Sequence, residues 1–263
     1  MRRLAPFLTA LVAPLLVPTP ADAFLGDPIG ANDWSCAPTA EHPTPVVLVH
    51  GTFGDRRSLL DRMSSMLTNR GYCVYSLDYG DRATGPVEDS AAELDAFVDR
   101  VLDSTGAAKV SLVGHSQGGM MPRYYIKNLG GDTVVDDLIG IAPSNHGTYN
   151  TAQLAPLEPL CFSCTQQAAD SEFLADLNAG DESPGAVSYT NVVTKHDRVV
   201  VPYTSGFLTE DPLVTNVTLQ EACTANLADH LHVIQDGAAI EWTLDALSHD
   251  GPADPTYQPS CLP

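Results

Sequence analysis

The sequence predicts an α/β fold in which a mostly parallel sheet is covered by helices on both faces. Continuous apolar runs, typical of strands that are buried on both faces, alternate with amphipathic stretches of helical period. The run 110–113 leads directly into Gly114-His-Ser-Gln-Gly118, and a helix-like stretch follows. This order of strand, G-x-S-x-G and helix is the context in which the pentapeptide marks a nucleophile elbow.

The expected elements follow one another with no internal repeat and no flexible linker. Strands are expected at 45–49, 72–77, 110–113, 134–142 and 187–193, and helices at 56–70, 90–102, 119–129 and 240–247. The helix after residue 90 is predicted from a capping-box pattern, Ser90-Ala-Ala-Glu93, and from an apolar stripe at helical spacing. The segment 148–185 fits neither period, so we expect a cap or lid insertion over the site.

The first residues have the three parts of a secretory signal peptide. Met1-Arg2-Arg3 is followed by an apolar stretch at 4–17 and by an Ala-x-Ala end at Ala23. The stretch is too short to span a membrane and contains proline. We therefore expect a signal peptide over 1–23, one exported domain over 24–263, and no transmembrane segment.

The chain is strongly acidic, with a formal net charge of −20 at pH 7. Such a charge repels nucleic acid and anionic membrane surfaces, so neither is an expected partner. The chain has no H-E-x-x-H or comparable ligand motif, and we expect no metal and no cofactor.

All six cysteines lie beyond the expected signal peptide. An even number in an exported chain predicts three disulfides, although spacing alone leaves the pairing open. Cys161-Phe-Ser-Cys164 is a single C-x-x-C, and we interpret it as a local loop staple rather than a redox or metal pair.

A serine nucleophile needs a base, and the base needs a carboxylate that holds its tautomer. Behind this kind of elbow the chain order is Ser, Asp or Glu, then His. We expect Ser116 to be the nucleophile and Asp197, just past the end of a strand, to be the carboxylate. The acidic residues in the expected cap are weaker candidates. His230 and His232 both follow, and the residues alone do not decide between them.

Two backbone N–H groups are expected to form the oxyanion hole. One belongs to Gln117, directly after the nucleophile, and the other to Thr52, in the turn after the first strand. The Thr52 hydroxyl is a possible third donor. The expected substrate groove consists of Phe53, Met120, Val199, Val200 and Leu231.

Four segments resemble the secreted bacterial triacylglycerol lipases of the class 2 family, and the layout is also similar to that of a fungal lipase. They are Val49-His-Gly-Thr-Phe-Gly54, Gly114-His-Ser-Gln-Gly-Gly119, Tyr124-Tyr-Ile-Lys-Asn-Leu129 and Asn145-His-Gly-Thr148. The resemblance implies an α/β-hydrolase fold over most of the chain.

The resemblance also assigns individual residues. The family's catalytic histidine begins a His-x-Gly pattern, which implies that His230 is the base and that His232 replaces the usual glycine beside it. His232 is then expected to crowd the base, and Pro122 to kink the helix after the elbow. The implied disulfides are Cys36–Cys73 and Cys223–Cys261, which leaves Cys161–Cys164 in the cap.

The expected function is that of a secreted serine ester hydrolase, a triacylglycerol lipase that acts through an acyl-enzyme. Its partner would be a lipid or other ester, reached at an oil–water interface, and the protein would be a monomer. The same triad would also serve a short-chain carboxylesterase, a polyester hydrolase or an acyltransferase. A different class remains open, namely an inactive secreted binding module.

Overall fold

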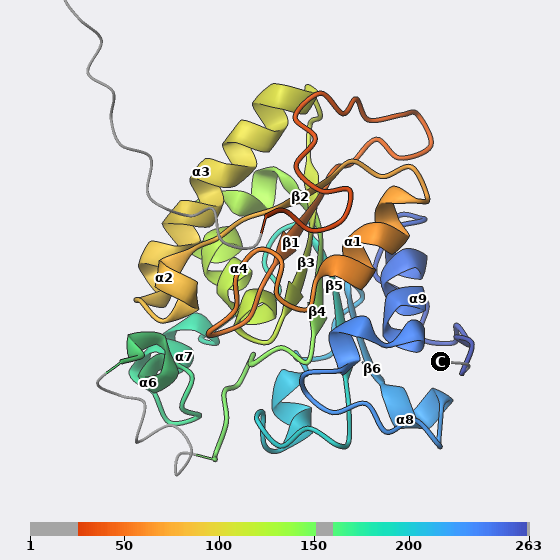
Figure 1. Ribbon diagram of the computed structural model, residues 1–263. Coiled ribbons are helices and arrows are strands. Elements are labelled where there is room, and N and C mark those ends of the chain that lie inside the picture. The colour runs from red at the N-terminus through yellow and green to blue at the C-terminus, as the bar shows by residue number, and fades with distance from the viewer. Residues whose placement is uncertain (1–25, 151–159, 262–263) are drawn as a thin grey trace, which may run out of the picture.

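The computed structural model describes residues 26–150 and 160–261, and one parallel sheet lies at the centre of this part of the chain (Figure 1). Its strand order is β2-β1-β3-β4-β5-β6. The strands are β1 (Val46–Val49), β2 (Val74–Ser76), β3 (Val110–His115), β4 (Val135–Ile141), β5 (Ser188–Val193) and β6 (Val214–Thr218). Every pair of neighbours is parallel, which confirms the predicted α/β class.

Helices cover both faces of this sheet (Figure 1). One face carries α3 and α4, and the other carries α1 and α9. The helices of the described part are α1 (Asp61–Thr68), α2 (Gly80–Ala83), α3 (Val87–Thr105), α4 (Gln117–Asn128), α6 (Phe162–Gln166), α7 (Glu172–Leu177), α8 (Leu219–Ala222) and α9 (Gly237–Ala246). Short 3-10 turns are η1 (Gly131–Thr133), η3 (Tyr203–Gly206) and η4 (Val233–Gln235).

The apolar run of β1 is continuous because it contributes to a core on each face. Val47 and Val49 pack into the core beneath α3 and α4, whereas Val46 and Leu48 pack into the core beneath α1 and α9. All four are fully buried. Since each buried aliphatic side chain stabilises the fold by roughly 1.5–3 kcal/mol, two such cores hold the sheet firmly between its helix layers.

The edge strand β6 was missing from the predicted elements. Its residues, Val-Thr-Asn-Val-Thr, contain only two apolar side chains, which are not adjacent, so the strand lacks the continuous apolar run from which the other strands were predicted. Asn216 faces the loop before the strand, where its side chain accepts from the backbone N–H of Leu208 and donates to the Leu208 carbonyl. An edge strand is half-covered, so its sequence is more polar than that of the central strands.

The helix expected at 56–70 is shorter, and α1 begins at Asp61. The reason lies in the turn before it. The Asp55 carboxylate accepts hydrogen bonds from the backbone N–H groups of the second and third residues that follow it. Leu59 then has a positive φ of 64°, which is incompatible with a continuous helix.

The helix expected from Ser90 begins three residues earlier, because α3 starts at Val87. Ser90 therefore lies inside the helix, where its hydroxyl donates to the carbonyl of Pro86. Glu93, the expected partner in the capping box, instead accepts a hydrogen bond from the backbone N–H of Gly80. The capping-box interpretation of this segment was wrong, although the helix itself was predicted.

Three disulfides link the six cysteines in the pairing that the resemblance implied. Cys36–Cys73 ties the segment before β1 to the start of β2, and Cys223–Cys261 ties the end of α8 to the C-terminal segment. Each closes a loop of nearly forty residues in the unfolded chain (separations 37 and 38). A loop of that size corresponds to about 3–4 kcal/mol in the chain-entropy model.

The expected signal peptide, 1–23, lies outside the described residues. Within the part of the chain that the structure describes, no helix is long and apolar enough to cross a membrane. The expected cap, 148–185, is described except for 151–159. We use "cap segment" for 160–185, which contains α6 and α7. It contacts the end of α2 through Ser163 and the start of α3 through Gln166.

A buried carboxyl, Asp137 in β4, makes the stability of this fold depend on pH. Burial raises its pKa from 3.8 to about 7, against a lowering effect of the hydrogen bond that the Ser111 hydroxyl donates to it at 2.7 Å. The Asp137 carboxyl ionises near pH 4 in the unfolded chain and near pH 7 in the folded protein. The free energy of unfolding therefore falls as the pH rises from 4 to 7. Above pH 7 it stays about 4 kcal/mol below its value at pH 4.

We therefore expect Asp137→Asn to raise the melting temperature by several degrees at pH 9 and to leave it nearly unchanged at pH 4. Asparagine can still accept from Ser111 and carries no charge to desolvate. Thermal melts of both proteins between pH 4 and pH 9 measure this difference. A difference in melting temperature that is the same at every pH would show that ionisation of Asp137 is not its cause.

Candidate active site

Ser116 occupies the tight turn between β3 and α4, as the G-x-S-x-G pattern predicted. Its backbone has φ 56° and ψ −123°, a strained conformation for a residue with a side chain. A Cβ on Gly114 would lie 1.8 Å from the carbonyl oxygen of Gly118, and a Cβ on Gly118 would lie 2.3 Å from that of Val49. Only glycine fits at either position, and this close approach holds the serine at the carboxyl end of the sheet.

Ser116, His230 and Asp197 form one hydrogen-bonded series. His230 Nε2 lies 3.0 Å from Ser116 Oγ, and His230 Nδ1 lies 2.7 Å from Asp197 Oδ2. The other carboxylate oxygen of Asp197 accepts the backbone N–H groups of Val199 and Val200, each at 2.8 Å. Both side chains of the His–Asp pair are almost completely buried. In this arrangement the carboxylate holds a proton on Nδ1, which leaves Nε2 free to accept the serine proton.

His232 lies away from this series. Its side chain is 74% exposed, and its Nδ1 lies 2.6 Å from the carboxylate of Asp229. The expectation that His232 would crowd the base was wrong, because Asp229 holds the second imidazole at the surface. Of the two histidines, the structure brings only His230 to Ser116.

His115 is a further buried residue of the site. Its ring centroid is 4.9 Å from that of His230, and its Nε2 lies 2.7 Å from the His230 carbonyl oxygen. Burial lowers the pKa of His115 to about 3, so the ring is neutral at ordinary pH and its Nε2 donates to that carbonyl. This hydrogen bond links the elbow to the loop of His230.

The turn after β1 brings Thr52 beside the elbow. A Cβ on Gly51 would lie 3.0 Å from Ser116 Cβ, an unusually short contact. The backbone of this turn therefore packs directly against the serine. The N–H of Phe53 donates to the carbonyl of Arg82 at 2.8 Å, and the Arg82 guanidinium donates back to the Phe53 carbonyl. These hydrogen bonds connect the turn to Arg82 in α2.

Within the described residues the backbone N–H of Thr52 makes no hydrogen bond, and Gln117 is the first residue of α4, where an N–H has no intrahelical acceptor. Both groups are therefore available to an oxyanion. The Thr52 hydroxyl, expected as a third donor, instead donates to Gln117 Oε1 at 2.7 Å.

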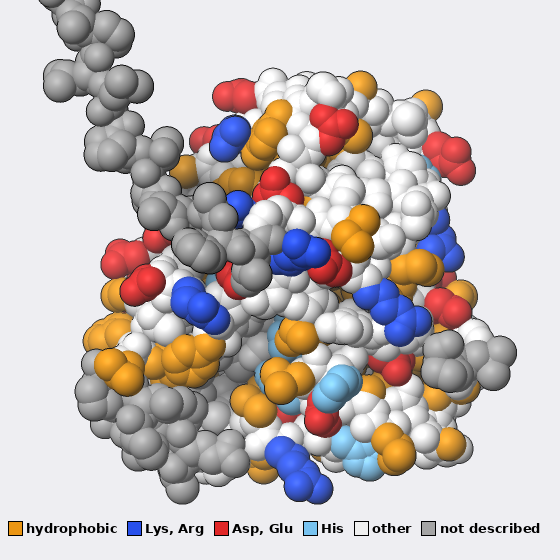
Figure 2. Space-filling view, viewed as in Figure 1, with side chains coloured by type: hydrophobic (Ala, Val, Ile, Leu, Met, Phe, Trp, Pro, Cys, Tyr) orange, Lys and Arg blue, Asp and Glu red, His pale blue; other side chains and the backbone are white. Residues whose placement is uncertain are grey.

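A cavity of about 330 Å³ opens over Ser116 and His230. Four of the five predicted groove residues line it, namely Phe53, Val199, Val200 and Leu231. Hydrophobic and histidine side chains gather in the lower half of the face shown in Figure 2. Polar side chains are also part of the lining, since Ser144, Thr148 and Gln167 contribute to it.

Met120, the fifth predicted groove residue, does not line the cavity. It is fully buried and belongs to the core beneath α3 and α4. The helix begins at Gln117, so residue 120 already lies one turn into α4, where its side chain packs into the core. Pro122 lies inside α4, which continues through it to Asn128. The kink expected at this proline stays a prediction.

The family model for Lipase (class 2) matches residues 43–243, a range that includes all three members of the Ser–His–Asp series. The chain belongs to this family. A triacylglycerol lipase of Vibrio cholerae is 36% identical over 117 residues, which cover 43% of this chain and 35% of that protein. One of Pseudarthrobacter phenanthrenivorans is 38% identical over 86 residues, or 30% of this chain and 27% of that protein. These matches span between about a quarter and about a third of the length of the curated relatives.

Solved structures show the same fold. Lipase B of Aspergillus fumigatus superposes with a TM-score of 0.70 at 24% identity, over 84% of this chain and 57% of that one. The mature form of the Bacillus licheniformis lipase BlEst2 superposes with a TM-score of 0.63 at 16% identity, over 81% of this chain and 94% of that one. The chain therefore has the α/β-hydrolase fold of lipases.

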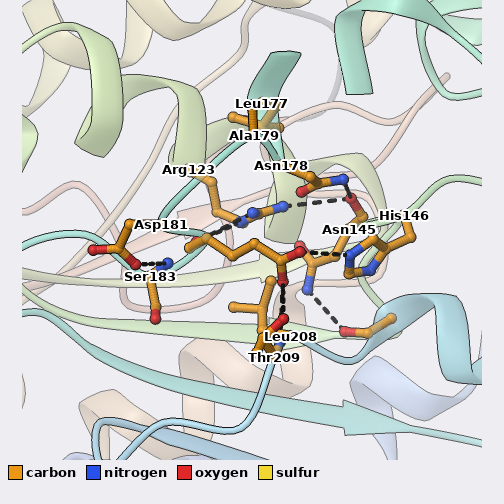
Figure 3. A network of polar contacts seen from close by, with 12 residues as sticks. Arg123, Asn145, His146, Leu177, Asn178, Ala179, Asp181, Ser183, Leu208 and Thr209 are labelled. Atoms are coloured by element: carbon orange, nitrogen blue, oxygen red, sulfur yellow. Dashed lines mark hydrogen bonds and ion pairs between the residues drawn. The ribbon is translucent and has the colours of Figure 1, made fainter. Parts of the chain in front are cut away.

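In this class 2 lipase family member, a buried polar network supports the cavity wall that follows β4 (Figure 3). Arg123 in α4 is fully buried and donates to the carbonyl oxygens of Glu182 and Asn145. Burial lowers the pKa of Arg123 to about 10. The Glu182 carboxylate in turn accepts from Thr209 at 3.0 Å and contacts His146 Nε2 at 3.1 Å. The network joins α4, the end of the cap segment and the residues just before Thr148.

In the described ranges, 26–150 and 160–261, no group of three or more His, Cys, Asp or Glu side chains is arranged to hold a metal ion.

Proposed function

We propose that this protein is a secreted serine carboxylic-ester hydrolase, a triacylglycerol lipase that acts through an acyl-enzyme. The observation that carries the proposal is the series Ser116–His230–Asp197, of which Ser116 and His230 line a cavity together with hydrophobic side chains. Membership of the class 2 lipase family supports it. Three disulfides support export, because disulfides persist in oxidising compartments.

In the proposed reaction, Ser116 Oγ attacks the ester carbonyl while His230 Nε2 takes its proton. The backbone N–H groups of Thr52 and Gln117 donate to the oxyanion, and one such donor is typically worth about 3–4 kcal/mol. His230 returns the proton to the departing alcohol, and Asp197 stabilises the imidazolium. Water then attacks the acyl-enzyme, losing a proton to His230, and Ser116 regains that proton as the carboxylic acid leaves.

Exposed hydrophobic side chains at the cavity support a lipid substrate. Phe53, Leu59, Val199 and Leu231 line the cavity and are each more than one-third exposed. Exposed apolar side chains that gather in one place mark surfaces that bind other molecules, and here they surround the entrance. A neutral oil surface suits this patch, because an anionic one would repel a protein with a net charge of −20.

A short-chain carboxylesterase is the second candidate, and the polar part of the cavity lining favours it. Ser144, Thr148 and Gln167 line the cavity, and polar side chains are poor partners for a long acyl chain. The triad chemistry would be unchanged. The two candidates differ only in the acyl groups that they accept and in their response to an oil–water interface.

Rates on substrates of increasing chain length separate the two candidates. For a lipase we expect turnover of emulsified long-chain triglyceride and a rise in rate when tributyrin passes its solubility limit. Soluble p-nitrophenyl acetate, butyrate and palmitate complete the series, and Ser116→Ala is the blank for each. Turnover confined to dissolved acetate and butyrate esters would contradict the lipase and leave the short-chain esterase.

A further inference from the structure

His115 makes the only hydrogen bond to the backbone of His230 in the described part of the chain. Its Nε2 lies 2.7 Å from the His230 carbonyl oxygen, and both residues are buried. No other described residue hydrogen-bonds to the N–H or the carbonyl of His230. The position of this stretch of backbone relative to Ser116 therefore depends on one bond.

The partner of His115 determines its tautomer. A carbonyl oxygen can only accept, so Nε2 of His115 carries the proton and Nδ1 does not. Burial keeps the ring neutral, since it lowers the pKa of His115 to about 3. The ring centroids of His115 and His230 are 4.9 Å apart. His115 thus supplies a donor without placing a positive charge beside an imidazole that takes up a proton in the proposed reaction.

The strand that leads to the nucleophile also carries this donor. His115 is the last residue of β3 and pairs with Ile141 in β4, and β3 lies inside the sheet between β1 and β4 (Figure 1). The turn after β1 packs against the His115 ring, because a Cβ on Gly51 would lie 3.2 Å from its Nδ1. The donor is therefore fixed by the sheet and by a neighbouring turn.

Other hydrogen bonds hold the loop on either side of His230. Before it, the carbonyl of Ala228 accepts from the hydroxyl of Thr194, just past β5, at 2.6 Å. After it, the Asp229 carboxylate accepts from the next two backbone N–H groups, which belong to the same turn. Neither contact links the loop to β3, so neither sets the distance between the base and Ser116.

We propose that His115 is a positioning residue that holds the backbone of His230 where its imidazole can take the proton of Ser116. The inference rests on the proposed function. Because His115 and Ser116 are consecutive, the nucleophile and the support of its base belong to one rigid element. Without the bond, the 3.0 Å contact between His230 Nε2 and Ser116 Oγ should form less often. A displacement of about 1 Å can lower a rate about a hundredfold.

The test compares substitutions of His115 in steady-state kinetics on p-nitrophenyl butyrate. His115→Phe keeps a ring but has no donor, and it should lower kcat by at least about tenfold. KM should change by less than about threefold, because His230 serves both formation and hydrolysis of the acyl-enzyme and both steps slow together. His115→Gln should recover kcat to within about threefold of wild type, since its amide N–H can donate to the same carbonyl. His115→Leu is a second donor-free variant and replaces His115→Phe if that protein does not fold.

Tyr72→Phe is the matched control for the loss of a buried hydrogen bond. Tyr72 is also buried, and its hydroxyl donates to a distant backbone carbonyl, that of Leu247, at 3.1 Å. It precedes β2, at the end of the sheet opposite Ser116, and it does not line the cavity. The melting temperatures of Tyr72→Phe and His115→Phe should fall by similar amounts, since each loses one hydrogen bond. Tyr72→Phe should keep the wild-type kcat.

A double variant shows whether His115 acts through His230. In the His230→Ala background, His115→Phe should cause no further loss in the rate at which a fluorophosphonate labels Ser116. A loss as large as the one His115→Phe causes in the wild-type background would contradict the proposed role.

Three kinetic results would also overturn the inference while the proposed function stands, given wild-type turnover. These are a wild-type kcat in the donor-free variant, an equal loss in His115→Gln, and an equal loss in Tyr72→Phe. A wild-type protein that neither hydrolyses esters nor reacts with a fluorophosphonate at Ser116 would overturn the proposed function and this inference together.

Discussion

Ser116→Ala is expected to lower kcat for p-nitrophenyl butyrate by about five to six orders of magnitude, the loss typical of removing the nucleophile of a serine triad. Without Oγ no acyl-enzyme can form, and His230 loses the group whose proton it accepts at 3.0 Å. The oxyanion donors remain, so a small rate above the uncatalysed reaction should persist. Initial rates at saturating substrate measure the loss.

The fold should survive this change. Alanine keeps the Cβ that already occupies the strained turn, and the glycines on either side remain. We expect the melting temperature of Ser116→Ala to stay within a few degrees of the wild-type value. Turnover within tenfold of the wild-type rate in a folded variant would remove Ser116 from the mechanism.

His230→Ala should cause a loss of similar size, about four to six orders of magnitude in kcat, because the serine hydroxyl then has no base. Asp197 keeps its two backbone N–H partners, so the carboxylate stays hydrogen-bonded after the imidazole is removed. The same substrate and the same initial-rate measurement apply.

His232→Ala is the matched control, two residues away in the same loop. Its imidazole is exposed and pairs with Asp229, so we expect its kcat to stay within about twofold of wild type. A large loss in His232→Ala with little loss in His230→Ala would exchange the roles of the two histidines and contradict the geometry.

Local sequence was enough to predict the elbow. Gly114 and Gly118 are required by backbone contacts within the turn itself and with β1, and the serine between them has no other place to lie. The position of Asp197 was predictable for a related reason, because parallel strands bring their carboxyl ends to one edge. Both predictions depend on short segments whose conformation their own residues determine.

The residues alone could not decide between His230 and His232. The two lie in one irregular loop, and the outcome depends on which partner each imidazole finds. The exposed His232 ring contacts Asp229. The buried His230 ring contacts Asp197, which is 33 residues away in the chain. A family pattern pointed to His230, but no periodicity or spacing within this chain did.

Long-range contacts also explain what the sequence did not reveal. Met120 was expected in the groove, yet α4 begins at Gln117 and the Met120 side chain packs into the core. The bond from Gln167 to Thr52 joins residues 115 positions apart, and neither residue belongs to a motif that links them. Such contacts depend on how the cap segment packs, which local patterns do not specify.

The central claim is that His230 activates Ser116 as a nucleophile, and covalent labelling tests it most directly. Wild type, His232→Ala, His230→Ala and Ser116→Ala are treated with a fluorophosphonate, and intact mass and peptide mapping follow the label over time. The account predicts one label, on Ser116, at similar rates in wild type and His232→Ala, orders of magnitude more slowly in His230→Ala, and none in Ser116→Ala. Rapid labelling of Ser116→Ala, or labelling of His230→Ala at the wild-type rate, would contradict it.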